Sequence, residues 1–195
     1  MSEITQSGLL CPLRVVDEQE LQGYMTRRNY LNHFNGKRPM TYPGEWMFAG
    51  GALEEVDDNL LETAVREFRE ETRYKGPITN IQELRETETR DPLRRRFHIE
   101  FYTATIDDTF EFVPVEGGEV IAVEWNTPRA FLDRIYSPDF TVEQIEAFKR
   151  YGLDDKRHGE HRVTKRQIPT INIPTFELLT AMTPELVAKY GTTDS

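Results

Sequence analysis

Three glutamates lie close together in the segment GGALEEVDDNLLETAVREFREET, which begins at Gly50. On a helix, which turns by about 100° per residue, Glu67, Glu70 and Glu71 share one face. Carboxylates three or four residues apart repel each other and destabilise a helix, and a bound divalent cation would reverse that penalty. Mg²⁺ and Mn²⁺ prefer hard oxygen ligands of this kind. The spacing therefore indicates a divalent-cation site.

Other residues around the glutamates strengthen this interpretation. Arg66 lies beside Glu67 and could hold a carboxylate in a fixed orientation. Gly50 and Gly51 close the apolar stretch WMFAGG, where glycine lets the backbone approach a ligand and a carbonyl could complete the metal shell. An acidic helix face is usually only a solvated surface. The combination with the glycine pair, the acidic run EEVDD and Arg66 favours a metal site instead.

The elements that must position these residues follow from periodicity. A helix is predicted from Leu60 to about Tyr74, since apolar residues recur at helical spacing without Pro or Gly. Further helices are predicted in TPRAFLDRI and TVEQIEAFKRY. The segments that we interpret as strands are LLCPLRVV and LQGYMTRR, joined by a polar turn, and then WMFAGG, ITNIQELRETETR, RRRFHIEFYTATI and VIAVEW. Strands mixed with few helices predict an α+β class, in the form of an α/β/α sandwich.

Size and charge limit the classes of protein that this chain could represent. The length of 195 residues fits one domain, with a helical addition over about residues 140–195. The net charge of -10 argues against long nucleic acid as a ligand, but divalent cations can bridge acidic groups to a small phosphorylated one. Cys11 is a lone cysteine, and neither a signal peptide nor a bilayer-spanning stretch is evident, so we expect a cytoplasmic protein that does not bind membranes.

The region around the glutamates resembles a Nudix box, which has the pattern G, five residues, E, seven residues, then REUxEExGU with U aliphatic. Gly51 matches the first glycine, Asp57 stands at the acidic position, and residues 66–71 match REUxEE. The approach GEWMFAGG is similar to the usual GxWxxPGG of the family. The resemblance covers roughly residues 9–135, with the box at about 50–73, and it implies a Nudix fold with a mixed β-sheet between helices.

The chain departs from the box at three places. Eight residues rather than seven separate Asp57 from Arg66, and Asp replaces Glu there. Ala49 replaces the usual Pro. Arg73 replaces the closing glycine, which leaves the helix end open and makes Gly76 a candidate for the left-handed residue. A similar lengthened, Asp-containing box occurs in Nudix enzymes that act on coenzyme A.

The resemblance implies a hydrolase that cuts the pyrophosphate bond of a nucleoside diphosphate linked to another moiety, such as coenzyme A, a nucleotide sugar or ADP-ribose. Glu67, Glu70 and Glu71, with the carbonyl of Gly50, would ligate Mg²⁺ or Mn²⁺. The metal would neutralise the diphosphate and lower the pKa of a bound water. The order of the early strands and the lengthened box lean towards coenzyme A.

The general base and the substrate contacts are assigned by weaker signals. Glu70 is our first candidate for the base, and Glu119 is the second, because Gly117 and Gly118 would let its turn move. Arg66 is counted with the catalytic residues for its orienting role. Arg27 and Arg28 end a predicted strand and could grip phosphate, and Trp46 could stack on a base, although surface and core roles are the usual ones for such residues. The four histidines show no metal spacing.

A rival interpretation is a Nudix-like domain that senses a nucleotide without cutting it. The intact glutamates count against it, since a sensor has no need to keep them. A cap hydrolase is disfavoured by the net charge. The sequence leaves open whether the chain forms a homodimer.

Overall fold

The computed structural model describes residues 4–16, 20–29, 31–32, 38–39, 44, 46–90, 95–107, 109–127 and 184–185. The helices expected in TPRAFLDRI and TVEQIEAFKRY lie beyond Thr127, outside the described residues, as does nearly all of the expected addition at 140–195. The elements run β1 (Ile4–Leu10), β2 (Leu13–Val16), β3 (Glu20–Arg28), β4 (Leu31–Asn32), β5 (Arg38–Pro39), β6 (Trp46–Met47), β7 (Ala49–Ala52), α1 (Leu60–Thr72), β8 (Thr79–Arg90), β9 (Arg96–Thr105) and β10 (Val120–Asn126).

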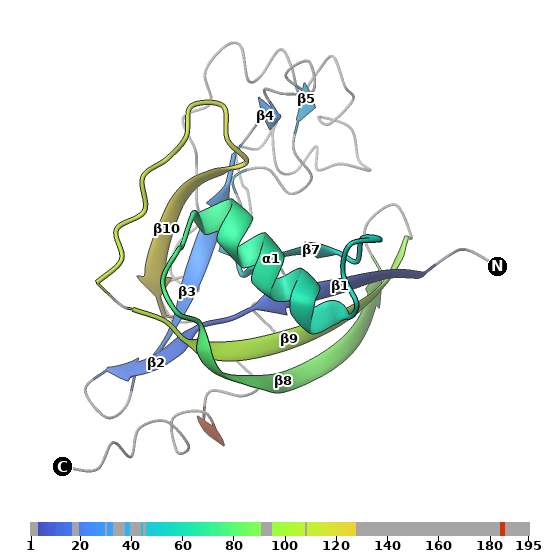
Figure 1. The fold of residues 1–195 in the computed structure, drawn as a ribbon, viewed down its shortest axis with the longest axis horizontal. Coiled ribbons are helices and arrows are strands. Elements are labelled where there is room, and N and C mark those ends of the chain that lie inside the picture. The colour runs from blue at the N-terminus through green and yellow to red at the C-terminus, as the bar shows by residue number, and fades with distance from the viewer. Residues whose placement is uncertain are drawn as a thin grey trace, which may run out of the picture.

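The strands form two main sheets (Figure 1). The first has the order β7-β1-β9-β8 and is mixed, because β1 pairs in parallel with β9 and antiparallel with β7. The second has the order β10-β3-β2, with β6 also paired to β3, while β4 and β5 form a small separate pair. A mixed sheet combined with a helix confirms the α+β class.

Two segments predicted as single strands each contribute to both sheets. LLCPLRVV divides into β1 and β2 because Pro12 has no N–H to offer a ladder. The N–H of Cys11 donates to Tyr102 at 2.6 Å and the carbonyl of Pro12 accepts from Tyr24 at 2.9 Å, so the chain changes sheets at this dipeptide. WMFAGG divides in the same way into β6 and β7, with Phe48 fully buried between them.

The hydrophobic core consists of two clusters, on opposite faces of β1. Leu9 packs with Leu21, Met25, Phe48 and Phe101 between the two sheets. Its neighbour Leu10 points the other way, as alternation along a strand requires. It joins a second cluster, built around Ala64 and Phe68 of α1. This second cluster fixes the helix against the first sheet.

Helix α1 is capped at its start and packed closely along β1, which it crosses in Figure 1. The side chain of Asn59 accepts from the N–H of Glu62 at 3.0 Å, so the helix begins at Leu60 as predicted. A Cβ at Gly8 would collide with the carbonyl of Leu60, which shows how closely strand and helix approach. In the described part of the chain, α1 is far too short and polar to cross a membrane.

The end of α1 differs from one expectation. Arg73 itself adopts the left-handed conformation, with φ of 62°, and its N–H donates to the carbonyl of Arg69 at 2.9 Å. The suggestion that the left-handed residue moves to Gly76 is therefore wrong. The reason is that the hydrogen bond closing the last helical turn requires this backbone conformation at position 73, whatever side chain is there.

Candidate active site

A cavity of about 500 Å³ lies alongside α1. It brings together five of the residues predicted from sequence, namely Arg66, Glu67, Glu70, Glu71 and Glu119. Its other lining residues are Glu54, Val56, Arg73, Phe112, Val115, Gly118 and Val120. The cavity thus combines an acidic helix face with apolar side chains from the segment between β9 and β10.

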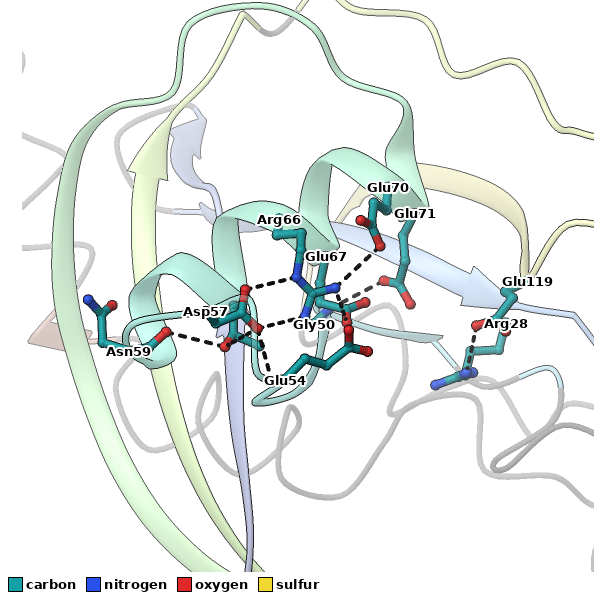
Figure 2. Close-up of polar contacts among 11 residues, drawn as sticks. Arg28, Gly50, Glu54, Asp57, Asn59, Arg66, Glu67, Glu70, Glu71 and Glu119 are labelled. Atoms are coloured by element: carbon teal, nitrogen blue, oxygen red, sulfur yellow. Dashed lines mark hydrogen bonds and ion pairs between the residues drawn. The ribbon is translucent and has the colours of Figure 1, made fainter.

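Arg66 is held in place by a network of carboxylates (Figure 2). Its Nε and Nη2 donate to the two carboxylate oxygens of Asp57 at 2.9 and 2.8 Å, a bidentate pair. Its Nη1 donates to Glu67 at 2.9 Å and to Glu70 at 3.3 Å. Arg66 therefore ties two of the glutamates to the loop before the helix, and it acts as a positioning residue.

Asp57, the acidic residue at the unusual spacing, is the anchor of this network. Its side chain is only 3% exposed, and it also accepts from the N–H of Glu54 at 3.1 Å and from the hydroxyl of Thr63 at 3.0 Å. The hydrogen bonds from Arg66 hold the pKa of Asp57 well below its usual range, and the same contact raises the pKa of Arg66. The lengthened box therefore still places a carboxylate beside Arg66.

Glu67 lies against the first glycine of the box. A Cβ on Gly51 would occupy the space that the Glu67 carboxylate fills, so a larger residue there would push this carboxylate out of its place. Burial raises the pKa of Glu67, and the nearby Glu70 and Glu54 add to the rise while Arg66 opposes it. The negative charge on Glu67 is thus only partly compensated by the protein.

Glu71 is the most perturbed of the three glutamates. Burial raises its pKa to about 8, with Arg28 opposing the rise and Glu67 and Glu119 adding to it. One oxygen of Glu71 accepts from the N–H of Gly50 at 3.3 Å (Figure 2). The structure thus shows the amide N–H of Gly50 as a hydrogen-bond donor to Glu71. The role of the Gly50 carbonyl as a metal ligand stays a prediction.

Glu70 is the exposed member of the set, with 61% of its side chain accessible to solvent. Its carboxylate contacts Arg66 at the solvent-exposed side of the site, so it is the least restrained of the three. This freedom suits a group that takes a proton from water, and Glu70 stays a predicted base.

Glu119 and Arg28 form a pair that lies beyond Glu71 from Arg66 in Figure 2. Their side chains are 3.3 Å apart. Asn29 holds the turn, because its N–H donates to the carbonyl of Glu119 at 2.7 Å and its side-chain amide to that of Gly118 at 2.8 Å. The turn was expected to be free to move. These bonds instead tie it to the end of β3.

The remaining predicted substrate contacts do not line the cavity. Trp46 is buried in the core between the sheets, which removes the reason to expect it to stack on a ligand. The reason is that Trp46 lies in β6, where the stretch WMFAGG passes from one sheet to the other. Nε of Arg27 donates to the carbonyl of Gly44 at 3.4 Å. Arg28 is also absent from the lining, but it reaches the site through Glu119.

The carboxylates in the cavity fit a hard divalent cation. Three glutamates from one helix line the cavity, and the absence of a side chain at Gly51 leaves room for the Glu67 carboxylate beside β7. Carboxylate oxygens are the donors that Mg²⁺ and Mn²⁺ prefer. Glu67, Glu70 and Glu71 would therefore hold such an ion.

A second group that could hold a metal lies outside the cavity, on β8 and β9. Oxygen or nitrogen atoms of Glu86, His98 and Glu100 are within 4.8 Å of one another. Sequence analysis missed this group, because the cross-strand register that pairs Glu86 with Glu100 is not visible in local spacing. No motif in the sequence would have indicated it.

Comparison with known proteins identifies the family. A model of the NUDIX domain matches residues 16–148 of the chain. The chain therefore belongs to the Nudix family and is a Nudix pyrophosphohydrolase, one of the enzymes that act on nucleoside diphosphate derivatives. No curated protein matches the chain.

Two solved structures agree on the fold, one from Alicyclobacillus acidocaldarius and one from Shewanella oneidensis. A NUDIX hydrolase from Alicyclobacillus acidocaldarius is similar with a TM-score of 0.59 and 15% identity, over 96% of this chain and 97% of that one. The NUDIX domain of Shewanella oneidensis NrtR, in complex with ADP ribose, is similar with a TM-score of 0.50 and 18% identity, over 78% of this chain and 88% of that one. The match to a MutT/nudix family protein from Enterococcus faecalis has a TM-score of 0.47 and 16% identity. It covers 65% of this chain and only 45% of that one.

Replacing Arg66 by lysine tests its positioning role. A lysine cannot form the bidentate pair with Asp57 and reach two glutamates at once, so Arg66→Lys should lower kcat roughly tenfold to a hundredfold, the usual effect of losing a group that orients metal ligands. Added Mn²⁺ should restore part of the rate. Arg69→Lys is the matched control, since Arg69 donates to the carbonyls of Tyr74 and Gly76 instead. Equal activity in the two variants would contradict the role.

Proposed function

We propose that this protein hydrolyses the pyrophosphate bond of a nucleoside diphosphate linked to another moiety, and that it uses Mg²⁺ or Mn²⁺ to do so. The observation that carries the proposal is the convergence of Glu67, Glu70 and Glu71 on one cavity, where burial raises the pKa of Glu67 and Glu71. Burial disfavours the ionised form of these two carboxylates, and a bound cation would stabilise that form.

The chain's own residues have separate roles in this proposal. Asp57 and Arg66 set the orientation of Glu67 and Glu70. Arg28 pairs with the Glu119 carboxylate at the edge of the metal site. A divalent cation, when bound, supplies charge neutralisation and activates water for attack on phosphorus. Glu70 or Glu119 would accept the proton that the water loses.

The shape of the cavity supports a nucleotide-like substrate. Phe112, Val115 and Val120 line it together with the acidic helix face. An apolar wall beside a metal-binding face can take a base or another planar group while the diphosphate lies at the metal. Coenzyme A, a nucleotide sugar and ADP-ribose all combine these parts, and ADP ribose is bound by the similar NrtR domain.

A non-catalytic nucleotide sensor is the second candidate. The similarity to the NUDIX domain of NrtR favours it, whereas the retention of all three glutamates favours the enzyme. Incubation with coenzyme A, nucleotide sugars and ADP-ribose, each with Mg²⁺ and with Mn²⁺, tests the two. Release of a nucleoside monophosphate, or of the other moiety as its phosphate, supports the enzyme. Tight binding of a nucleotide without product over hours would support the sensor. Long nucleic acid is still expected not to bind.

Glu119→Gln should cut kcat by about a hundredfold or more if Glu119 is the general base, and leave KM little changed. The substitution keeps the side-chain shape and a weaker contact with Arg28, so folding should survive. Steady-state kinetics at two Mn²⁺ concentrations separates a general base from a residue that supports the metal and from a turn residue with no catalytic role. Partial rescue at high Mn²⁺ would instead indicate support of the metal. A nearly unchanged rate would return the role of base to Glu70, and Glu116→Gln serves as control, since Glu116 does not line the cavity.

A further inference from the structure

Arg73 occupies a backbone conformation that disfavours its own side chain. Its φ of 62° and ψ of 18° lie in the left-handed region, which glycine adopts at no steric cost. The Nudix box has glycine at this position, and this chain has arginine. Residues held in such conformations tend to be found where the side chain has a function.

The side chain of Arg73 lines the cavity and is exposed. Among the described residues it makes no hydrogen bond or ion pair, although five glutamates line the same cavity. The other arginines near the site differ in this respect. Arg66 is engaged by Asp57, Glu67 and Glu70, and Arg28 is paired with Glu119. Arg73 therefore presents an uncommitted cation to whatever enters the cavity.

We propose that Arg73 binds a phosphate group of the substrate that is separate from the diphosphate being cut. The inference rests on the proposed function, because it assumes that the diphosphate occupies the metal site on Glu67, Glu70 and Glu71. Guanidinium groups bind phosphate through paired hydrogen bonds. The preferred substrate then carries an additional phosphomonoester, for example on a ribose hydroxyl.

Matched pairs of nucleotides that differ by one ribose phosphate test this subsite. Coenzyme A is compared with dephospho-coenzyme A, and NADPH with NADH, by kcat/KM with Mg²⁺ and by calorimetric Kd with Ca²⁺. The wild-type protein should favour the phosphorylated member of at least one pair by roughly tenfold to a hundredfold, the effect of one charged hydrogen-bonded contact. Arg73→Gly should reduce that ratio to near one, and Arg73→Lys should keep part of it.

A second readout and a control separate this role from a structural one. Arg73→Gly should also raise the Tm, because glycine relieves the left-handed strain, so the preference is lost without damage to the fold. Lys75→Ala removes a nearby exposed charge that does not line the cavity, and it should keep the wild-type ratio.

Two results would overturn the proposal. One is a wild-type protein that treats both members of each pair alike. The other is an Arg73→Gly variant that weakens both members equally, which would place Arg73 on the diphosphate itself. If no diphosphate is cut at all, the proposed function fails, and the Kd ratio still decides the role of Arg73.

Discussion

Glu67→Gln and Glu71→Gln are each expected to lower kcat roughly a thousandfold or more, equivalent to about 4 kcal/mol of barrier. Each substitution keeps the shape of the side chain and removes one carboxylate, a proposed metal ligand, from the cavity face of α1. Steady-state kinetics at saturating Mg²⁺ measures the effect. Glu55→Gln is the matched control, because Glu55 belongs to the same acidic run, is exposed, and does not line the cavity.

The same variants should fold, and Glu71→Gln should be more stable than the wild type without metal. The pKa of Glu71 lies at about 8 in the folded protein, above its ordinary value of 4.5. The folded state therefore binds more protons than the unfolded state between these values, and the Glu71 contribution weakens stability as the pH rises through this window. The gain from Glu71→Gln should be larger at pH 8 than at pH 5 in thermal unfolding. A variant less stable at pH 8, or one with near-wild-type turnover, would contradict the assignment.

Much of the site could be predicted because it lies on one helix. The spacing of Glu67, Glu70 and Glu71 places them on one face whatever the rest of the fold does, and Asn59 marks the start of that helix. The pairing of Asp57 with Arg66 could not be read from sequence, since the loop between them sets its geometry. The loop between Asp57 and α1 accommodates the extra residue of the box.

The long-range features were not predictable, because local pattern does not encode the partner of a strand. The divisions of LLCPLRVV and WMFAGG between two sheets follow from tertiary pairing, although Pro12 was a signal that a ladder had to stop there. The tethering of the Glu119 turn by Asn29 joins residues far apart in the chain. The conformation of Arg73 was missed because glycine was assumed to be needed at a left-handed position.

Removal of divalent metal should abolish turnover, and addition of Mg²⁺ or Mn²⁺ should restore it. Glu71 retains a proton near neutral pH, and that proton must leave before the carboxylate can ligate a cation. The apparent affinity for Mg²⁺ and the rate at limiting Mg²⁺ should therefore rise from pH 6 to pH 8. Assays with chelator, followed by titration of each metal at several pH values, measure both. Full activity in excess chelator would contradict metal dependence.

Direct titration of Mn²⁺ tests the central claim, that the glutamates of α1 hold the catalytic metal. Electron paramagnetic resonance of free Mn²⁺ gives the affinity of the wild type, of Glu67→Gln combined with Glu71→Gln, and of Glu86→Gln. The double variant should lose tight binding at the site, and Glu86→Gln should keep it. Unchanged binding in the double variant, with loss in Glu86→Gln, would instead place the metal at the group on β8 and β9 and contradict a site on α1.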